Sequence, residues 1–249
     1  VDQFRSVVTD SCIGCGSCVS ACAFGALKME EKKVIYNSKA CMACGHCFAI
    51  CPKGAIVFKE FTAEQADALK TEAQLQNAIQ QRRSIRSFKS ELISQEDLKK
   101  LINVAKFCPS AKNTRTTQFL VISREIMDQI QFDIASSVNA KLAEIQKVQD
   151  IVFRGAKQMI IAIQPSENSE MFRQDATIAL TTIELAAVSE GFGTFWGGFV
   201  HGACMKNKDI AKKMGVKEGF DVVGCLAIGV PNIKYQRPVL REDMEVEFM

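Results

Sequence analysis

The sequence has little that would tie it to a membrane or to nucleic acid. No apolar run approaches the ~18 residues of a membrane span, and the first eleven residues lack the basic and apolar segments of an export signal. The charges nearly balance, with 31 Lys and Arg against 28 Asp and Glu. A net charge of +3 gives no reason to expect nucleic acid or a membrane as a partner. We therefore expect a cytoplasmic protein.

Cysteine is the residue that the chain has in excess. Eight of its eleven cysteines form two copies of the pattern C-x2-C-x2-C-x3-C, offset by 29 residues. The glycine pairs Gly16 and Gly45, and Gly25 and Gly54, follow the same offset, which indicates a duplicated half-module. The spacing predicts the thiolate ligands of two [4Fe-4S] clusters. The copies are Cys12, Cys15, Cys18 and Cys22, and Cys41, Cys44, Cys47 and Cys51.

Zinc binding and disulfide formation are two other uses of cysteine. Zinc sites use C-x2-C pairs rather than triplets with a trailing cysteine. A disulfide framework is typical of exported proteins, and this sequence shows no export signal. Both alternatives are disfavoured.

Residues 5–58 resemble bacterial two-cluster ferredoxins, in which the distal cysteine of each run binds the other cluster. The resemblance groups Cys12, Cys15, Cys18 and Cys51 around one cluster, and Cys41, Cys44, Cys47 and Cys22 around the second. One departure is that Cys51 precedes the expected Pro52, whereas Cys22 precedes Ala23. We expect this change to alter local solvation and potential without loss of a ligand.

The chain is about 190 residues longer than this module requires, which is enough for a second domain with its own core. We predict a cysteine domain at residues 1–60, a linker at 61–73 and a second domain at 74–249. Thr62 and Gln65 have capping-box spacing, so the linker is predicted to be partly helical.

Mixed α and β periodicity follows the linker. Leu75, Ile79 and Arg82 have helical spacing, and further helices are predicted from Ser94 to about Phe107 and over residues 175–190. Strands are predicted at residues 118–123, 159–164 and 222–228. The pattern indicates an α+β or α/β domain and leaves the topology open.

A second group of chemically suggestive residues begins at Arg82, Arg83, Ser84 and Arg86. Guanidinium groups and a hydroxyl suit a phosphate dianion, although so short a basic run is also typical of a solvated helix end. Three further motifs follow in order: Cys-Pro-Ser-Ala-Lys-Asn at 108–113, the glycine-rich residues 191–199, and Ile-Gly-Val-Pro at 228–231 with Arg237 beyond them.

In this order the motifs resemble the nitroreductase family of FMN enzymes over residues 74–240, and the whole chain resembles ferredoxin-fused nitroreductases. The resemblance implies an α+β protein whose ferredoxin-like module precedes a three-layer α-β-α flavin domain. It also implies a homodimer with FMN at the interface.

The family's residue roles transfer to matching positions. Arg82, Arg83, Ser84, Arg86 and Arg237 match residues around the FMN phosphate and ribityl chain. The loop that reaches the flavin from the partner subunit is matched by Pro109, Ser110, Ala111 and Asn113. Gly197 and Gly198 match a backbone turn that can bond flavin N5, and the neighbouring Trp196 is expected either in the core or at the flavin. The run Gly191-x-Gly193 lacks the third glycine of a dinucleotide fingerprint and follows a predicted helix.

Other positions carry weaker expectations. Many family members have Gln-Pro-Trp where this chain has Thr-Arg-Thr-Thr-Gln at 114–118, so Arg115 either favours an anionic substrate or has no role. His201 is either a proton donor near the flavin or an ordinary polar residue. Cys108, Cys204 and Cys225 are expected to be buried and inert.

These features predict an oxidoreductase in which two clusters relay electrons to FMN. Nitroaromatics, quinones and enones are the expected acceptors, with reduced ferredoxin or NAD(P)H as the donor. Two alternatives remain open: a module that passes electrons between ferredoxin and a protein partner, and a redox sensor. A sensor would need a DNA-reading or docking element, and the sequence shows none.

Overall fold

The computed structural model describes residues 6–41, 44–58, 62–68, 74–167 and 170–249. The chain forms two compact units. The first, here called the cysteine unit, comprises Val1–Arg82 together with Lys234–Met249, and the second, the sheet unit, comprises Arg83–Ile233. This division differs from the domains expected from sequence, because the last sixteen residues make their contacts with the cysteine unit.

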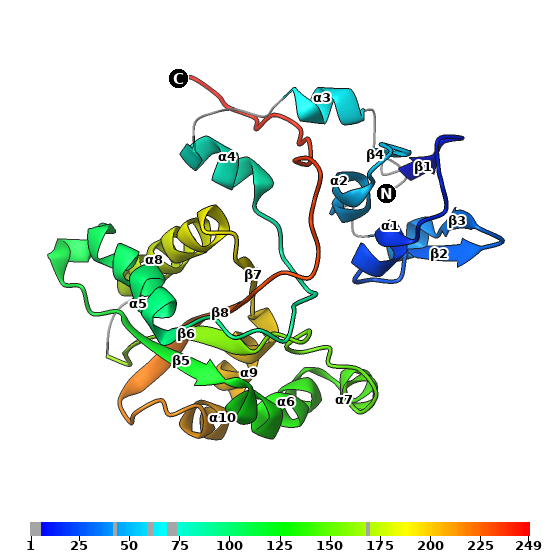
Figure 1. The fold of residues 1–249 in the computed structure, drawn as a ribbon. Helices are drawn as coiled ribbons and strands as arrows, with labels where there is room; N and C mark the ends of the chain where they lie inside the picture. Colours follow the sequence, from blue (N-terminus) through cyan, green and yellow to red (C-terminus); the bar gives the residue numbers. More distant parts are fainter. Residues whose placement is uncertain (1–5, 42–43, 59–61, 69–73, 168–169) are drawn as a thin grey trace. The chain divides into compact units, whose positions relative to one another are not determined.

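Short elements make up the cysteine unit (Figure 1). Two antiparallel strand pairs, β1 with β4 and β2 with β3, accompany three helices of five residues and one of eight among the described residues. The bounds are β1 Ser6–Val8, α1 Ser17–Ala21, β2 Leu27–Glu30, β3 Lys33–Tyr36, α2 His46–Ile50, β4 Ile56–Phe58, α3 Ala63–Asp67 and α4 Gln74–Gln81.

The internal duplication is visible in the backbone. Gly16 and Gly45 cap the N-termini of α1 and α2 with φ values of 74° and 73°. Gly25 and Gly54, which also lie 29 residues apart, have φ values of 63° and 60°. Residues with a Cβ adopt this left-handed conformation at a cost, so glycine is favoured at all four positions.

The predicted linker is helical where the structure describes it. The Thr62 side chain accepts a hydrogen bond from Gln65 N, and the Gln65 side chain accepts one from Thr62 N, which completes a capping box at the start of α3. Phe61 and residues 69–73 of the predicted linker lie outside the described residues.

The sheet unit contains a four-stranded antiparallel sheet with the order β5-β6-β8-β7. Its strands are β5 Gln118–Ser123, β6 Gln158–Pro165, β7 Gly193–Trp196 and β8 Phe220–Gly229. The predicted strand at 118–123 is confirmed, and the other two predicted strands are extended by one or two residues at each end. Sequence periodicity missed β7, because the strand is only four residues long.

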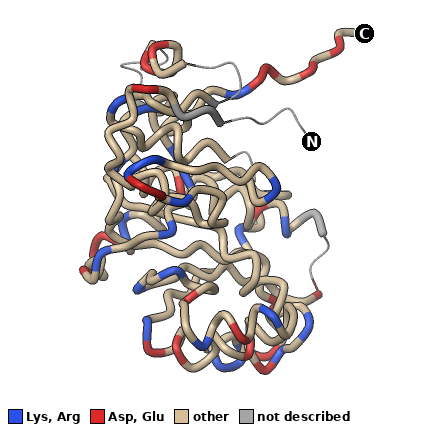
Figure 2. Tube along the Cα trace, turned by 90° about the vertical axis from the view of Figure 1, so that its right-hand side faces the viewer, with Lys and Arg blue, Asp and Glu red and all other residues tan. Residues whose placement is uncertain are grey.

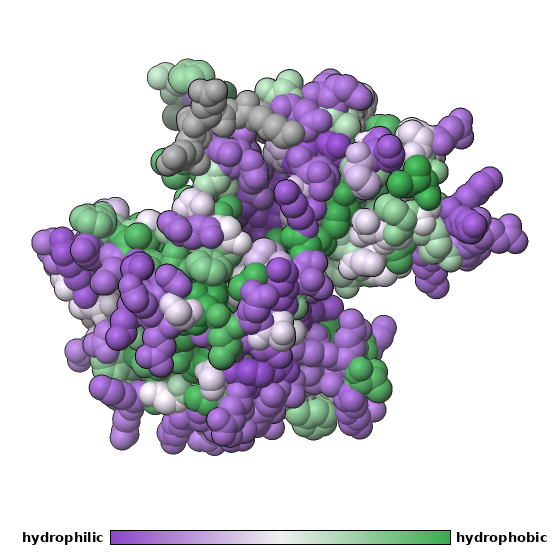
Figure 3. Space-filling model, in the orientation of Figure 1, coloured by the Kyte–Doolittle hydropathy of each residue, from purple (hydrophilic) through white to green (hydrophobic). Residues whose placement is uncertain are grey.

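Helices cover both faces of this sheet, which makes the unit three-layered as expected. Figure 1 shows α5 and α8 on one face and α6, α9 and α10 on the other. The helices are α5 Gln95–Asn103, α6 Arg124–Val138, α7 Ala140–Gln146, α8 Glu170–Ser189, α9 Gly198–Lys206 and α10 Lys208–Lys213, with 3-10 turns η2 Val104–Phe107 and η3 Ala111–Asn113. Hydrophilic residues dominate the outward side of α6 and α10 (Figure 3).

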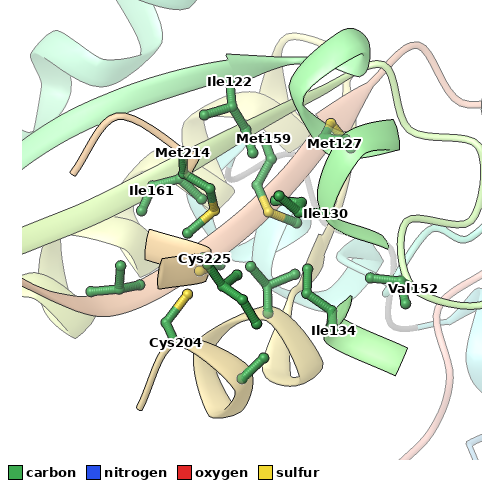
Figure 4. Close-up of a cluster of buried hydrophobic side chains, with 14 of the residues drawn as sticks. Ile122, Met127, Ile130, Ile134, Val152, Met159, Ile161, Cys204, Met214 and Cys225 are labelled. Atoms are coloured by element: carbon green, nitrogen blue, oxygen red, sulfur yellow. The ribbon is translucent and has the colours of Figure 1, made fainter. Parts of the chain in front are cut away.

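Two hydrophobic cores lie on opposite faces of the sheet. Successive side chains of a strand point to opposite faces, so Met159, Ile161 and Ile163 of β6 enter one core while Ile160 and Ala162 enter the other. Figure 4 shows the first core, where Met159 lies beside Ile130 and Ile161 lies beside Met214. Within the described part of the chain, no helix combines the length and apolar character that a membrane span requires.

Candidate functional site

One pocket of the cysteine unit gathers the four cysteines that the ferredoxin resemblance groups together. Cys12, Cys15, Cys18 and Cys51 all line it, beside apolar residues such as Ile13 and Ile56. Four soft thiols around one apolar pocket are the donor set that an iron-sulfur cubane takes, so these residues fit such a group.

The two distal cysteines have matching hydrogen bonds. Ala26 N donates to Cys22 Sγ, and Ala55 N donates to Cys51 Sγ, each at 3.2 Å. An amide that donates to sulfur stabilises the thiolate form and tunes a bound cluster. The 29-residue repeat therefore reproduces the environment of the sulfur atoms as well as their spacing.

The remaining cysteines of the repeat lie in mixed surroundings. Hydrogen bonding to Ser17 lowers the pKa of the exposed Cys15, whereas burial raises the pKa of Cys18. Cys41, Cys44 and Cys47 are partly buried before and within the start of α2. Met42 and Ala43, between the first two of these, lie outside the described residues.

In the sheet unit, the predicted phosphate segment is attached to the edge strand β7. Ser84 forms a parallel bridge with Thr194, and Ile85 N donates to Thr194 O at 2.8 Å. Gly193 permits this approach, since a Cβ there would lie 2.9 Å from three atoms of Ile85. Sequence reasoning recognised Gly193 only as part of a motif, and the close approach supplies its physical reason.

Guanidinium groups gather around this segment. Arg83 is 7% exposed, and Arg86 Nη1 donates to Ser84 O at 3.3 Å. Arg154, which sequence reasoning missed, is half-buried with a left-handed φ of 53°. Burial lowers the pKa of Arg154, and the positive charge of Arg86 lowers it further. Two cations that repel one another are suited to an anion that neutralises both, such as a phosphate.

The two glycines after Trp196 have different roles. Gly197 N donates to Cys225 O at 2.8 Å, and a Cβ on Gly197 would lie 2.9 Å from Met159 Cε, so Gly197 is committed to the core. Gly198 is the first residue of α9, where an N–H has no acceptor within the helix. Apart from its chain neighbours and the backbone of α9, no atom of the described residues lies within 4 Å of a Cβ built on Gly198. Its N–H is therefore the one suited to an acceptor such as flavin N5.

A buried carboxylate holds β7 against α8. Glu184 is 3% exposed, and its two oxygens accept hydrogen bonds from Thr194 Oγ1 at 3.0 Å and Trp196 Nε1 at 3.1 Å. Trp196 is thus anchored through its ring nitrogen, although part of its ring remains exposed. Glu184 fixes both the strand that carries the phosphate segment and the residue before the glycine turn.

The loop of residues 109–115 is strained and is anchored by Asp175. Lys112, Asn113 and Arg115 all have left-handed φ values, of 52°, 54° and 49°. Both carboxylate oxygens of Asp175 accept from Ala111 N, at 3.0 and 3.1 Å. Strained backbone of this kind persists only where the surroundings hold it and is concentrated at functional sites.

A pocket of about 260 Å³ lies beside this loop. Its lining combines apolar side chains, such as Ile102 and Phe119, with polar groups. The residues of the loop that line it include Pro109, Ser110 and Arg115, with Asp175 and Lys106 as further charged groups. An apolar pocket with a few convergent polar groups is typical of a small-molecule site.

Comparison with known proteins identifies the family. A model described as the nitroreductase family matches residues 79–230, which is more than half of the chain. The chain belongs to the nitroreductase family. A second model, described as a 4Fe-4S dicluster domain, matches residues 11–61. This nitroreductase is thus an oxidoreductase with a ferredoxin-type domain at its N-terminal side.

Similar proteins support the assignment. A protein of Archaeoglobus fulgidus, named "Putative NADH dehydrogenase/NAD(P)H nitroreductase", is 27% identical over 61% of this chain and 83% of its own. Crystal structures of FMN-bound nitroreductases from Desulfitobacterium hafniense and Bacteroides fragilis have the same fold, with TM-scores of 0.63 and 0.62. They are 22% and 18% identical and align over 72% of this chain and 100% of theirs.

Two residues assigned to the phosphate site belong to the cysteine unit of this nitroreductase. Arg82 N donates to Ala78 O at the end of α4. Arg237 Nη1 donates to Cys51 O at 2.6 Å, and Arg237 Nε lies 3.6 Å from Asp67 Oδ1. The role of Arg237 at FMN stays a prediction, and its observed contacts are with a predicted cluster ligand.

Cys204 and Cys225 are buried as expected, whereas Cys108 is only partly buried and lines the pocket beside the 109–115 loop. Burial raises the pKa of Cys204 to about 12 and that of Cys225 well above its usual range. Figure 4 places both within the first core. Cys108 Sγ, which is partly buried, donates to Thr182 Oγ1 at 3.1 Å. Burial, and after it the charge of Arg173, lowers the pKa of His201, so the ring is neutral at pH 7.

Proposed function

We propose that this nitroreductase takes up electrons singly at two [4Fe-4S] clusters in the cysteine unit and delivers them in pairs from FMN in the sheet unit. The observation that carries the proposal is that one chain holds both kinds of site. The pocket lined by Cys12, Cys15, Cys18 and Cys51 suits one cluster, and the Arg86 and Arg154 pair suits a flavin phosphate.

The sheet unit supplies binding and orientation for the flavin. Ser84, Arg86 and Arg154 would hold the phosphate, while Gly198 N–H would donate to N5 and tune that atom without a titratable group. FMN supplies the conversion between single electrons and electron pairs when it is bound. Glu184 accepts hydrogen bonds from Thr194 and Trp196 of β7. It would therefore hold in place both the phosphate segment, which is attached to β7, and the glycine turn that follows the strand.

We further propose that the active form is a homodimer in which Pro109, Ser110, Ala111 and Asn113 reach the flavin of the partner subunit. The strained loop and its Asp175 anchor support this role, because a loop that completes another subunit's site must hold its shape before assembly. The lining of the neighbouring pocket, with its apolar walls and Arg115, suits a flat acceptor that carries a negative charge.

The proposed acceptors are nitroaromatics, quinones or enones. For a quinone, two reduced ferredoxins each give up one electron, and the quinone takes up both electrons with two protons from solvent to become a hydroquinone. In this proposal both protons come from solvent, so no protein acid has to supply them.

Anaerobic reduction of the purified protein by NADH, NADPH and reduced ferredoxin, followed optically, tests the proposal. We expect reduced ferredoxin to bleach both the iron-sulfur and the flavin absorbance, and a quinone to restore it. Bound iron and flavin must also be present in about the amounts that two cubanes and one FMN require. Zinc instead of iron, or a flavin that ferredoxin cannot reduce, would contradict the proposal.

A further inference from the structure

The C-terminal segment of residues 235–241 is attached to helix α2 of the cysteine unit. Gln236 N donates to Ala49 O at 2.9 Å, and Tyr235 Oη lies 3.0 Å from His46 Nδ1. A Cβ on Gly45 would lie 2.5 Å from Val239 Cγ1, so the glycine that caps α2 also permits the segment to approach. Helix α2 carries Cys47, and Cys51 is the residue that caps its C-terminal end. The segment therefore contacts the part of the chain that connects both predicted clusters.

Arg237 brings a buried positive charge to this position. Its side chain is 8% exposed, and Nη1 donates to Cys51 O at 2.6 Å with Phe48 O at 3.5 Å. Arg237 forms an ion pair with Asp67, which is 3.6 Å away and 43% exposed, and the fully exposed Glu64 is a second, weaker negative charge near it. A guanidinium on these carbonyls stabilises the C-terminal end of α2, and its charge stays close to Cys51.

The two halves of the duplicated module differ in this charge. Cys22 and Cys51 have the same amide-to-sulfur bond, and their carbonyls accept the same turn bond, from Gly25 N at 3.2 Å and from Gly54 N at 3.3 Å. Among the hydrogen bonds of the described residues, an arginine donates to the carbonyl of Cys51 and none donates to that of Cys22. Arg237 therefore breaks the symmetry of the module at one distal ligand.

We propose that Arg237 raises the reduction potential of the cluster held by Cys12, Cys15, Cys18 and Cys51 above that of its twin. The inference rests on the proposed function, since it requires both clusters. Reduction adds one negative charge to a cluster, and a nearby buried cation favours the reduced form because the protein interior screens charge poorly. Because Arg237 favours the reduced form of this cluster, an electron that enters the pair of clusters is held there preferentially.

Other charges of the segment have weaker effects. Arg241 is exposed, and its Nη2 donates to Cys44 O at 3.3 Å. The residues beyond it form an exposed acidic run, visible as the red stretch near the C-terminus in Figure 2. Solvent and salt screen exposed charges strongly, so the buried Arg237 has the larger influence on a cluster.

The test is a redox titration of the full-length protein with its cofactors, monitored by electron paramagnetic resonance so that each cluster gives its own midpoint potential. In Arg237→Gln we expect the higher midpoint to shift to a more negative value, which narrows the gap between the clusters. Arg237→Lys keeps the charge and should retain most of the gap. Lys33→Gln, which removes an exposed charge on β3 of the same unit, is the matched control and should leave both potentials in place.

Asp67→Asn gives a result that a merely structural role would not produce. Removal of the carboxylate that opposes Arg237 should shift the same midpoint potential to a more positive value. If Arg237→Gln loses iron, the Asp67→Asn result alone tests whether the charge of Arg237 sets this potential. Unchanged potentials in Asp67→Asn, or in an iron-replete Arg237→Gln, would overturn the inference. Loss of FMN from Arg237→Gln at unchanged potentials would assign Arg237 to the flavin phosphate instead. Absence of iron from the wild-type protein would refute the proposed function, and this result differs from an unchanged potential in iron-replete protein, which would refute the inference about Arg237.

Discussion

The two units of this chain are stabilised in different ways. Among the largest side chains that are fully buried, Phe48 is in the cysteine unit, and the others, such as Phe153, Leu180 and Ile161, are in the sheet unit. The described helices of the cysteine unit have five to eight residues, while α6 and α8 of the sheet unit have 15 and 20. A module with so little core depends on its cofactors for stability, whereas a three-layer sheet can fold on its own packing.

The largest effect should follow from removal of iron. Without its clusters, the region of residues 11–58 should lose protection from amide hydrogen exchange, because ligand binding supplies much of its folding free energy. The sheet unit should keep its protection. Exchange measured by mass spectrometry on protein with and without iron checks this, and an unchanged cysteine module would show that its small core is sufficient.

Removal of a buried side chain from the sheet unit should destabilise that unit and leave the iron content unchanged. Phe153→Ala removes a fully buried ring and should destabilise the sheet unit by about 3–5 kcal/mol without loss of iron. Val148→Ala, at a side chain that is 88% exposed, is the control and should have almost no effect. Denaturant unfolding together with iron analysis measures both quantities. Iron loss in Phe153→Ala would mean that the two units do not fold independently.

The affinity of the sheet unit for FMN should depend on the charges of two arginines. Arg86→Ala and Arg154→Ala should each weaken FMN binding by about 1.5–3 kcal/mol, the range for hydrogen bonds to a charged group. Iron content should not change, and Lys99→Ala on the exposed side of α5 should bind FMN normally. Fluorescence titration of the flavin-free protein with FMN gives the affinities. Normal binding in both arginine variants would mean that the phosphate lies elsewhere.

The smallest effect concerns an ion pair within the sheet unit. Arg124 and Asp150 lie 2.6 Å apart. Burial would raise the pKa of Asp150, but hydrogen bonds from Arg124 and from Gly155 N and Phe153 N outweigh it and lower the pKa. The pair therefore contributes stability above the unfolded pKa of about 3.9, which is lost as pH falls through the lower folded pKa.

Asp150→Asn should thus destabilise the protein by about 1–1.5 kcal/mol at pH 7 and by progressively less below about pH 4. Asp128→Asn, at a half-exposed partner of Arg124, should cost less than about 1 kcal/mol. Unfolding at a series of pH values measures both. A destabilisation by Asp150→Asn that does not depend on pH would show that the carboxylate acts through packing instead.

The sequence predicted those features that local pattern determines. The duplicated cysteine module and the long strands β6 and β8 both follow from short-range patterns, while the left-handed φ of the repeated glycines became apparent only in the structure. The three-layer arrangement came from the family resemblance, since periodicity alone left the sheet order open.

Long-range contacts could not be predicted in the same way. Arg154 lies 68 positions after Arg86, and Arg237 lies 186 positions after Cys51, so no spacing rule connects them. Asp175 and Glu184 could have been noticed in the sequence, because they are acidic residues within an Ala- and Thr-rich helix. The structure shows that both are buried, which is uncommon for acidic residues unless they are hydrogen-bonded. The C-terminal segment carries no motif that links it to the cysteine unit, and only the fold shows its contacts.

The central claim is that the cysteine unit feeds electrons to the sheet unit, and single-turnover reduction tests it most directly. Flavin absorbance is followed after anaerobic mixing with reduced ferredoxin, for the wild-type protein and for Cys15→Ser and Cys44→Ser. Each substitution removes a ligand of a different predicted cluster. We predict that flavin reduction slows sharply in both variants, while dithionite still reduces the flavin that they bind. Flavin reduction by ferredoxin at the wild-type rate in cluster-deficient variants would contradict the account.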